Sequence, residues 1–126
     1  MPLDVTAREK EPGIWVIYPV GSIDSTTHKN VQDFVNQTIE DHSPKVVIFH
    51  MEGVHFISSM GVRVVLATRK RLRGRGAKLL MTNLRPQIKM VFEILRALPP
   101  ERIFSSMQEL DDYLAHVQRQ VLLQER

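Results

Sequence analysis

Residues 45–66 read KVVIFHMEGVHFISSMGVRVVL and contain a strand, a loop and a helix in close succession. The run Val46-Val47-Ile48-Phe49 is β-branched and aromatic, which is typical of a strand buried on both faces. We interpret residues 50–58 as a loop and the next residues as a helix that stops at Gly74 and Gly76. Its expected apolar stripe is Gly61, Val62, Val65, Leu66 and Leu72. A buried strand joined to a helix in this way predicts a parallel α/β sheet.

The N-terminal third of the chain predicts a hairpin followed by a helix. Apolar residues alternate with polar ones over residues 3–7, and a denser apolar run covers 15–20. Glu11-Pro12-Gly13 joins the two runs, so they read as a β-hairpin. The apolar period then becomes helical, which predicts a helix over 26–42. The stripe of that helix consists of Val31, Phe34, Val35, Thr38 and Ile39.

The C-terminal half predicts two more strands and two more helices. Residues 78–82 form a second buried strand, and Pro86 opens a third helix at a position where its missing N–H is harmless. The expected buried residues of that helix are Ile88, Val91, Phe92 and Leu95. A short strand at about 102–104 precedes Ser106 and Glu109, which have the spacing of a capping box. The expected buried stripe of the last helix consists of Leu110, Tyr113, Leu114, Val117 and Val121.

The element order is therefore β-β-α-β-α-β-α-β-α, which predicts a single small α/β domain over residues 1–126. Its sheet is expected to be mixed but mostly parallel, with an N-terminal hairpin and four helices. The core is expected to cover about 5–117, with the last helix extending to about 124. Binding sites in such folds gather on loops at the strand ends. This places the functional candidates on residues 21–26, 50–60 and 82–86.

Composition excludes several classes of chemistry. The chain has 126 residues, a formal net charge of +3 and no cysteine, so disulfides, thiolate catalysis and zinc-thiolate sites are ruled out. No apolar run is long enough to span a membrane and the start lacks a signal-peptide pattern, so we expect no membrane span and a cytoplasmic protein. Nine basic residues and no acidic ones lie between Gly53 and Glu93. Such a segment raises the alternative of nucleic-acid binding.

Enzyme motifs are missing, and we expect no cofactor. The chain has neither a phosphate-binding glycine loop nor a nucleophile elbow. His50, Glu52 and His55 lie close in sequence, but their spacing is unspecific, and the alternative is that they are solvated loop residues. We therefore predict no metal site. Asp24 follows a strand, where it either holds a turn or faces a partner.

Ser58 and Ser59 fall where the loop after the buried strand becomes a helix. One hydroxyl at this position can accept a hydrogen bond from the first helical turn, which is ordinary N-capping. The same exposed N–H groups and the positive end of the helix dipole would also tolerate a phosphate. A phosphoserine adds about −1.5 to −2 charges at neutral pH. The local pattern therefore allows either a cap or a phosphorylation switch.

The chain from about Val5 to Val117 resembles the STAS domain family of bacterial anti-sigma factor antagonists. The resemblance is carried by three segments, namely Gly21-Ser22-Ile23-Asp24, the run from Val46 to Val62 that contains Ser58-Ser59-Met60-Gly61, and the strand with Asn83 at its end. Family members usually have an aspartate before the phosphorylated serine and another at the end of the preceding strand. This chain has Ser58 and His50 there, and Met60 where a small polar residue is common.

The resemblance implies a regulatory binding module without catalysis of its own. Such a protein binds an anti-sigma factor that is also a serine kinase, which releases the sigma factor, and phosphorylation ends the binding. The resemblance places the phosphorylation at Ser59, with Ser58 as the alternative acceptor. The residues expected to contact the partner are Ser22, Asp24, Ser25, His55, Ser58, Ser59, Met60, Val62 and Arg63.

Two other functions remain open at this point, as does the oligomeric state. The first is a non-phosphorylated STAS-like subunit of a sensory or transport complex. The second is nucleic-acid binding through residues 63–89, although only Phe92 supplies an aromatic ring within 57–92 for base stacking. Residues 69–75 crowd the end of the second helix, where cations complement the helix dipole. Val121, Leu122 and Leu123 extend the last apolar stripe, so we expect a monomer or a weak dimer.

Overall fold

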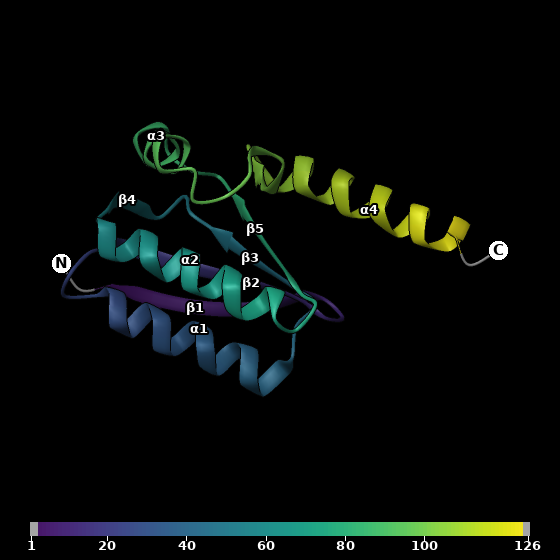
Figure 1. Cartoon of the computed structure of the whole chain (residues 1–126), viewed down its shortest axis with the longest axis horizontal. Coiled ribbons are helices and arrows are strands. Elements are labelled where there is room, and N and C mark those ends of the chain that lie inside the picture. Colours follow the sequence, from purple (N-terminus) through teal and green to yellow (C-terminus); the bar gives the residue numbers. More distant parts are fainter. Residues whose placement is uncertain (1–2, 125–126) are drawn as a thin grey trace.

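The computed structural model describes residues 3–124, and it confirms the predicted α/β class with an N-terminal hairpin and four helices (Figure 1). The elements are β1 (Asp4–Glu11), β2 (Ile14–Ile23), α1 (His28–His42), β3 (Val46–His50), β4 (Val54–Ile57), α2 (Ser59–Arg73), β5 (Lys78–Thr82), α3 (Pro86–Leu95), the 3-10 turn η1 (Pro100–Arg102), β6 (Ile103–Phe104) and α4 (Met107–Gln124). None of the helices within residues 3–124 combines the length and the apolar character that a membrane crossing requires.

The sheet is mixed, with one antiparallel pair. Its strand order is β1-β2-β3-β5-β6, and β4 pairs with β2 outside this path. β1 and β2 form the predicted hairpin, whose turn contains Gly13 at a φ of 81°. This left-handed conformation favours glycine, because a Cβ atom there would meet the backbone. All other strand pairs are parallel, as the alternation of strands and helices predicts.

Strand β2 is long enough to pair with two strands on the same side. Its first residues pair with β3, with Ile14 opposite Val46, and its last residues pair with β4, with Ile23 opposite Ile57. The prediction that residues 50–58 are all loop is therefore wrong for His50, which ends β3, and for the four residues of β4. The chain turns at Met51, which is buried, and then resumes the strand direction.

Two hydrophobic clusters lie on opposite faces of the sheet. α1 and α2 cover one face and α4 lies on the other (Figure 1). Successive side chains of a strand point to opposite faces of the sheet. In β3, Val47 and Phe49 therefore belong to the first cluster and Ile48 belongs to the second. Ile88 and Phe92 bring α3 into the first cluster, and Leu110 and Leu114 bring α4 into the second.

The helical stripes are confirmed in part. The stripe of α1 is buried or half-buried as predicted. In α2, Leu66 is 42% exposed, while Val64 and Thr68 are buried instead. This helix packs against both the sheet and α1, so its buried face is wider and rotated relative to a stripe that faces the sheet alone. Leu95, the last residue of α3, is 55% exposed, contrary to prediction.

The last helix begins much as predicted. The Ser106 hydroxyl accepts a hydrogen bond from the Glu109 N–H at 3.2 Å, as the capping box requires. The Glu109 carboxylate accepts from the Ser105 hydroxyl instead of bonding back to the cap residue. Tyr113 and Val117 are half-buried, and the side chains of Val121 and Leu122 lie outside the described part. Leu123 is 62% exposed.

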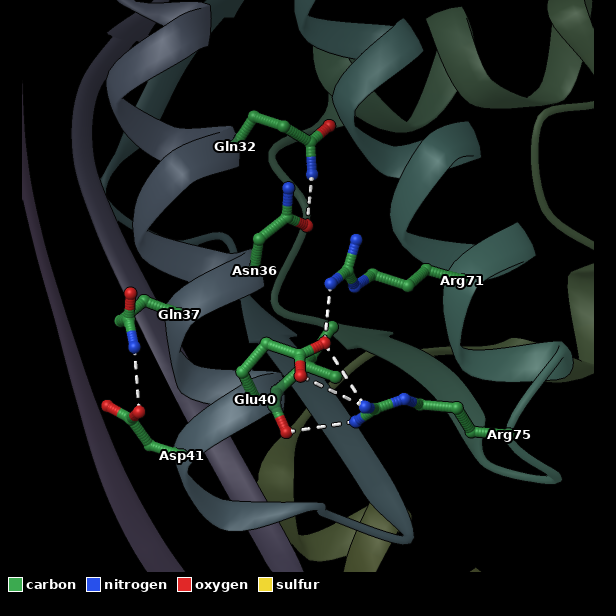
Figure 2. Close-up of polar contacts among 8 residues, drawn as sticks. Gln32, Asn36, Gln37, Glu40, Asp41, Arg71 and Arg75 are labelled. Carbon is green, nitrogen blue, oxygen red and sulfur yellow. Dashed lines mark hydrogen bonds and ion pairs between the residues drawn. The ribbon is translucent and has the colours of Figure 1, made fainter.

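Arg71 in the last turn of α2 and Arg75 just after the helix bind α1 while remaining exposed. Glu40 accepts hydrogen bonds from Arg71 and Arg75 (Figure 2). Arg75 also donates to the carbonyl oxygen of Ile39 at 3.2 Å. The hydrogen bond from Arg71 and the charge of Arg75 lower the pKa of the Glu40 carboxyl. The basic residues at the end of α2, which the sequence predicts to complement the helix dipole, therefore also join α1 to α2.

Candidate functional site at the start of helix α2

The end of β2, strand β4 and the start of α2 are joined through backbone hydrogen bonds. The Gly21 N–H donates to the Gly53 carbonyl oxygen at 2.9 Å, and the Ser58 N–H donates to the Ile23 carbonyl oxygen at 2.9 Å. Parallel pairing of β2 and β4 aligns the two strand ends. The loop that contains Asp24 therefore lies beside the turn that contains Ser58 and Ser59.

The loop before α3 lies against the same region. The Met51 N–H donates to the Thr82 carbonyl oxygen at 2.9 Å, which links the ends of β3 and β5. Arg85 Nε donates to the Glu52 carbonyl oxygen at 2.9 Å, and Gln87 Nε2 donates to that of His55 at 3.4 Å. The three loops predicted to carry function, residues 21–26, 50–60 and 82–86, are thus neighbours.

Ser58 is the N-cap of α2. Its backbone is extended, with φ −90° and ψ 175°, and its hydroxyl accepts a hydrogen bond from the Gly61 N–H at 3.4 Å. Its carbonyl oxygen accepts from the Val62 N–H at 3.0 Å, and its side chain is half-buried. The hydroxyl of Ser58 is therefore engaged in starting the helix, which is the capping role that the sequence pattern allowed.

Ser59 differs from its neighbour in accessibility. It is the first residue of α2 and is exposed, and its hydroxyl has no hydrogen-bond partner among residues 3–124. N–H groups in a first helical turn lack partners within the helix and carry the positive end of its dipole. The Ser59 residue is thus exposed to solvent near the positive end of the helix dipole.

Gly61 allows the start of α2 to pack closely on the strand ends. A Cβ atom at this position would lie 2.5 Å from Ile57 Cγ1 and 2.7 Å from the carbonyl oxygen of Ile23. Real Cβ atoms do not approach other heavy atoms so closely, so a glycine is needed here for steric reasons. The first turn of α2 is consequently held against both β2 and β4.

Asp24 holds the turn that leads into α1. Its Oδ1 atom accepts hydrogen bonds from the Thr26 N–H at 2.9 Å, the Thr26 hydroxyl at 2.8 Å and the Thr27 N–H at 3.2 Å. These bonds, led by the one from the Thr26 hydroxyl, lower the pKa of the Asp24 carboxyl. No described residue donates to Oδ2, so this oxygen can still accept a bond from a partner.

The remaining predicted contact residues divide by exposure. Ser25, His55 and Arg63 are exposed, and Ser22 and Met60 are half-buried. Val62 is only 3% exposed, so its side chain supports α2 from the core instead of lying on the surface as we expected for a contact residue. Phe56, which we did not predict as a contact, is 53% exposed on β4. The sequence alone did not indicate this exposure, because phenylalanine is more often buried than exposed.

The histidines near this site do not form a metal centre with their acidic neighbour. Within residues 3–124, no three histidine or acidic side chains are close enough together to hold a metal ion. His50 instead packs against Tyr18, with ring centroids 5.1 Å apart. His55 is exposed on β4.

The comparison with known families agrees with this geometry. Residues 6–110 match the family model described as the STAS domain. The chain belongs to the STAS domain family. The match covers β2, β4 and the start of α2, so the segments joined at the candidate site all lie within the STAS domain.

Solved structures similar to this STAS domain include both antagonists and a transporter-family protein. The anti-sigma factor antagonist SpoIIAA in its unphosphorylated form has 18% identity and a TM-score of 0.76, with 90% of this chain and 97% of that chain covered. An anti-sigma factor antagonist from Mycobacterium paratuberculosis has 21% identity and a TM-score of 0.74, with 93% and 95% covered. A sulfate transporter family protein from Wolinella succinogenes has 19% identity and a TM-score of 0.67, with 89% and 93% covered. These likenesses establish a shared fold.

Proposed function

We propose that this STAS domain is an anti-sigma factor antagonist whose binding is switched by phosphorylation of Ser59. In its unphosphorylated state it binds an anti-sigma factor that is also a serine kinase, and the sigma factor is released. The partner contacts the surface formed by residues 21–26, residues 55–60 and the exposed side chain of Arg63. The protein has no catalytic role in this exchange.

The observation that carries the proposal is the difference between the two adjacent serines. The Ser58 hydroxyl caps α2, whereas the Ser59 hydroxyl is exposed and unpaired among the described residues. A kinase can reach Ser59 without disturbing the start of the helix. A phosphate there adds about −1.5 to −2 charges to a surface fitted to a neutral hydroxyl, which disrupts the contact.

The phosphorylated protein is expected to stay folded. Negative charge near a helix N-terminus is favourable by about 0.3–1 kcal/mol at exposed positions. Ser59→Asp should therefore unfold at the same or a slightly higher temperature than the wild type. The change in partner binding then reflects the surface and not loss of structure.

The direct test is phosphorylation by a serine kinase that binds the protein, with the modified residue mapped by mass spectrometry. We expect one phosphate on the wild type, none on Ser59→Ala and one on Ser58→Ala. Modification of Ser58 alone would move the switch to the capping residue. No modification at either serine would overturn the switch.

Binding measurements test the consequence of phosphorylation. Ser59→Asp is expected to weaken the kinase complex by at least about tenfold, because it places an unpaired charge in the contact. Ser59→Ala should bind within about threefold of the wild type, since only a small hydroxyl is lost. Ser43→Asp is the matched control: it adds the same charge at an exposed serine after α1, away from the start of α2. Equal affinities for all three variants would contradict the proposal.

A second candidate function is a STAS-like subunit that stays unphosphorylated in a transport or sensory complex. It is favoured by the likeness to the sulfate transporter family protein, which extends over 93% of that chain. Such a subunit would co-purify with a membrane component, and Ser59→Asp would leave that association unchanged. The two functions are therefore separated by the same variant.

A further inference from the structure

Two adjoining hollows lie beside the C-terminal half of α2, and we call them together the basic groove. The first, with a volume of about 630 Å³, lies between α2, α3 and η1. The second, of about 470 Å³, continues towards β5. Arg69 and Pro99 line both hollows, so the two share a wall and form one elongated depression.

The two ends of the basic groove differ in character. Pro99, Pro100 and Ile103 line the first hollow with accessible apolar surface, and the buried side chains of Phe92 and Leu98 lie beneath it. Arg73, Lys78 and Arg102 line the second, which is strongly cationic. A ligand that fits the whole groove must therefore have both an apolar part and negative charge.

Most cations of the basic groove form no ion pair with a side chain that the structure describes. Glu93 is the acidic residue that lines it, and it lies 4.0 Å from Lys89. No ion pair with a described residue engages Arg69, Arg73, Lys78 or Arg96. Arg71 lies on the same helix and Arg75 in the turn that follows it, but Glu40 binds both of them. Among the side chains that the structure describes, the arginines on the α1 side of α2 are thus paired and those on the groove side are not.

We propose that the basic groove binds an acidic segment of a protein partner. Carboxylates of the segment pair with Arg69, Arg73 and Lys78, and an apolar side chain enters the hollow against Pro99 and Ile103. Guanidinium groups suit this role because their planar donors match a carboxylate in a two-pronged contact. The apolar side chain supplies an anchor of the kind that dominates peptide affinity.

The shape and lining of the groove favour a peptide over other anions. A bilayer surface cannot enter a hollow, so it would leave the apolar surface of the first hollow uncovered. Single-stranded nucleic acid needs exposed aromatic rings for base stacking, and the ring that lines the groove, Phe92, is fully buried. A small inorganic anion would pair with the arginines but leave the apolar end empty.

The groove is separate from the proposed switch. Ser59 and Arg69 are ten positions apart on one helix, which corresponds to roughly 15 Å at 1.5 Å per residue. The inference therefore stands whether or not Ser59 is phosphorylated. The groove would supply a second contact to a partner, or a contact to a different one.

The test is a titration of the full chain into a fluorescein-labelled synthetic peptide in which glutamates alternate with leucines, followed by fluorescence anisotropy. We expect saturable binding that weakens with added salt, because exposed charge pairs are screened. Arg69→Gln with Arg73→Gln should weaken binding about tenfold, since two charge-assisted contacts are lost. Arg71→Gln with Arg75→Gln removes the same charge at and just after the end of that helix and should change affinity less than about twofold.

Several outcomes would overturn the inference. No saturable binding of the peptide would do so, as would equal losses in the two double variants, which would indicate attraction by net charge alone. The groove would instead be assigned to nucleic acid or to membranes if duplex DNA or anionic vesicles bound more tightly than the peptide and lost affinity in the same variants. The variant Arg69→Lys with Arg73→Lys retains the charges, and its partial recovery of binding separates a lost contact from a misfolded protein.

Nuclear magnetic resonance supplies an independent map of the site. Amide shifts on peptide addition should concentrate on residues around Arg69, Phe92 and Ile103 and leave Ser59 unchanged. Shifts centred on the start of α2 would place the peptide elsewhere and contradict the inference.

Discussion

Individual residues hold the start of α2 in place, and Gly61 has the strictest requirement. We expect Gly61→Ala to destabilise the fold by about 1–3 kcal/mol, a typical cost of overpacking. The added methyl group would press on the carbonyl oxygen of Ile23, which cannot move without losing its bond to Ser58. Urea unfolding followed by circular dichroism measures the effect.

Gly74 provides the matched control for this substitution. It has a helical φ of −61°, and the heavy atom nearest to a Cβ there, the Arg71 carbonyl oxygen, would lie at 3.5 Å. Gly74→Ala should therefore stabilise the protein by about 0.4–1 kcal/mol, through a less flexible unfolded chain. Substitution of glycine by alanine is thus expected to lower the stability of the fold at Gly61 and to raise it at Gly74. A loss of stability at both would show that close packing is not the special feature of Gly61.

Site residues could be inferred from the sequence to different degrees. The spacing of Ser58 and Ser59 indicated a helix start, but it could not indicate which hydroxyl would serve as the cap. That depends on the geometry of one turn, in which Ser58 is extended and Ser59 is already helical. The burial of Val62 was likewise hidden, because a residue in the first turn of a helix can face either the partner or the core.

At the level of elements, periodicity identified the helices and the long strands but not strand β4. A four-residue strand carries little pattern, and β4 is held by pairing with the end of β2, more than 30 residues earlier in the chain. The helical stripes were predicted as if each helix had one neighbour. α2 has two, the sheet and α1, so Val64 and Thr68 are buried and Leu66 is not.

The contact between α1 and α2 should depend on pH through Glu40. The arginines lower the pKa of the Glu40 carboxyl below its ordinary value of 4.5. The contact therefore stabilises the native state fully at pH values above 4.5, and this stabilisation is lost as the pH falls through the lower native pKa. We expect Glu40→Gln to be less stable than the wild type at neutral pH and equally stable in strong acid. Urea midpoints measured from neutral pH to about pH 3 test this.

Asp41→Asn is the control for this pH profile. Asp41 is the next residue of α1, and its carboxylate accepts a hydrogen bond from Gln37 on the same helix. The substitution removes the same charge without touching the arginines. If both variants lost stability equally across the range, net charge would explain the result and the contact between α1 and α2 would not.

At the level of the whole molecule, α2 separates two surfaces of different chemistry. Its N-terminal end presents a neutral serine, whereas its C-terminal half lines the basic groove. We expect Ser59→Asp to change the affinity of the acidic peptide for the groove by less than about twofold, because sites this far apart usually act independently. Anisotropy titrations of Ser59→Asp, of the double variant Arg69→Gln with Arg73→Gln, and of the triple combination test this. A tenfold effect of Ser59→Asp would instead show that the two ends are coupled.

The hydrogen bond between Ser58 and Ile23 bears on how quickly this protein could respond to a signal. The turn before Ser59 is fixed to the end of strand β2 by this hydrogen bond and by the close packing at Gly61. A phosphate on the Ser59 hydroxyl would therefore leave the backbone conformation of this turn unchanged. Both forms would then share one conformation, and no slow rearrangement would separate them. No conformational change would persist after the phosphate is removed, so the rates of the enzymes that add and remove the phosphate would alone set the timing of the response.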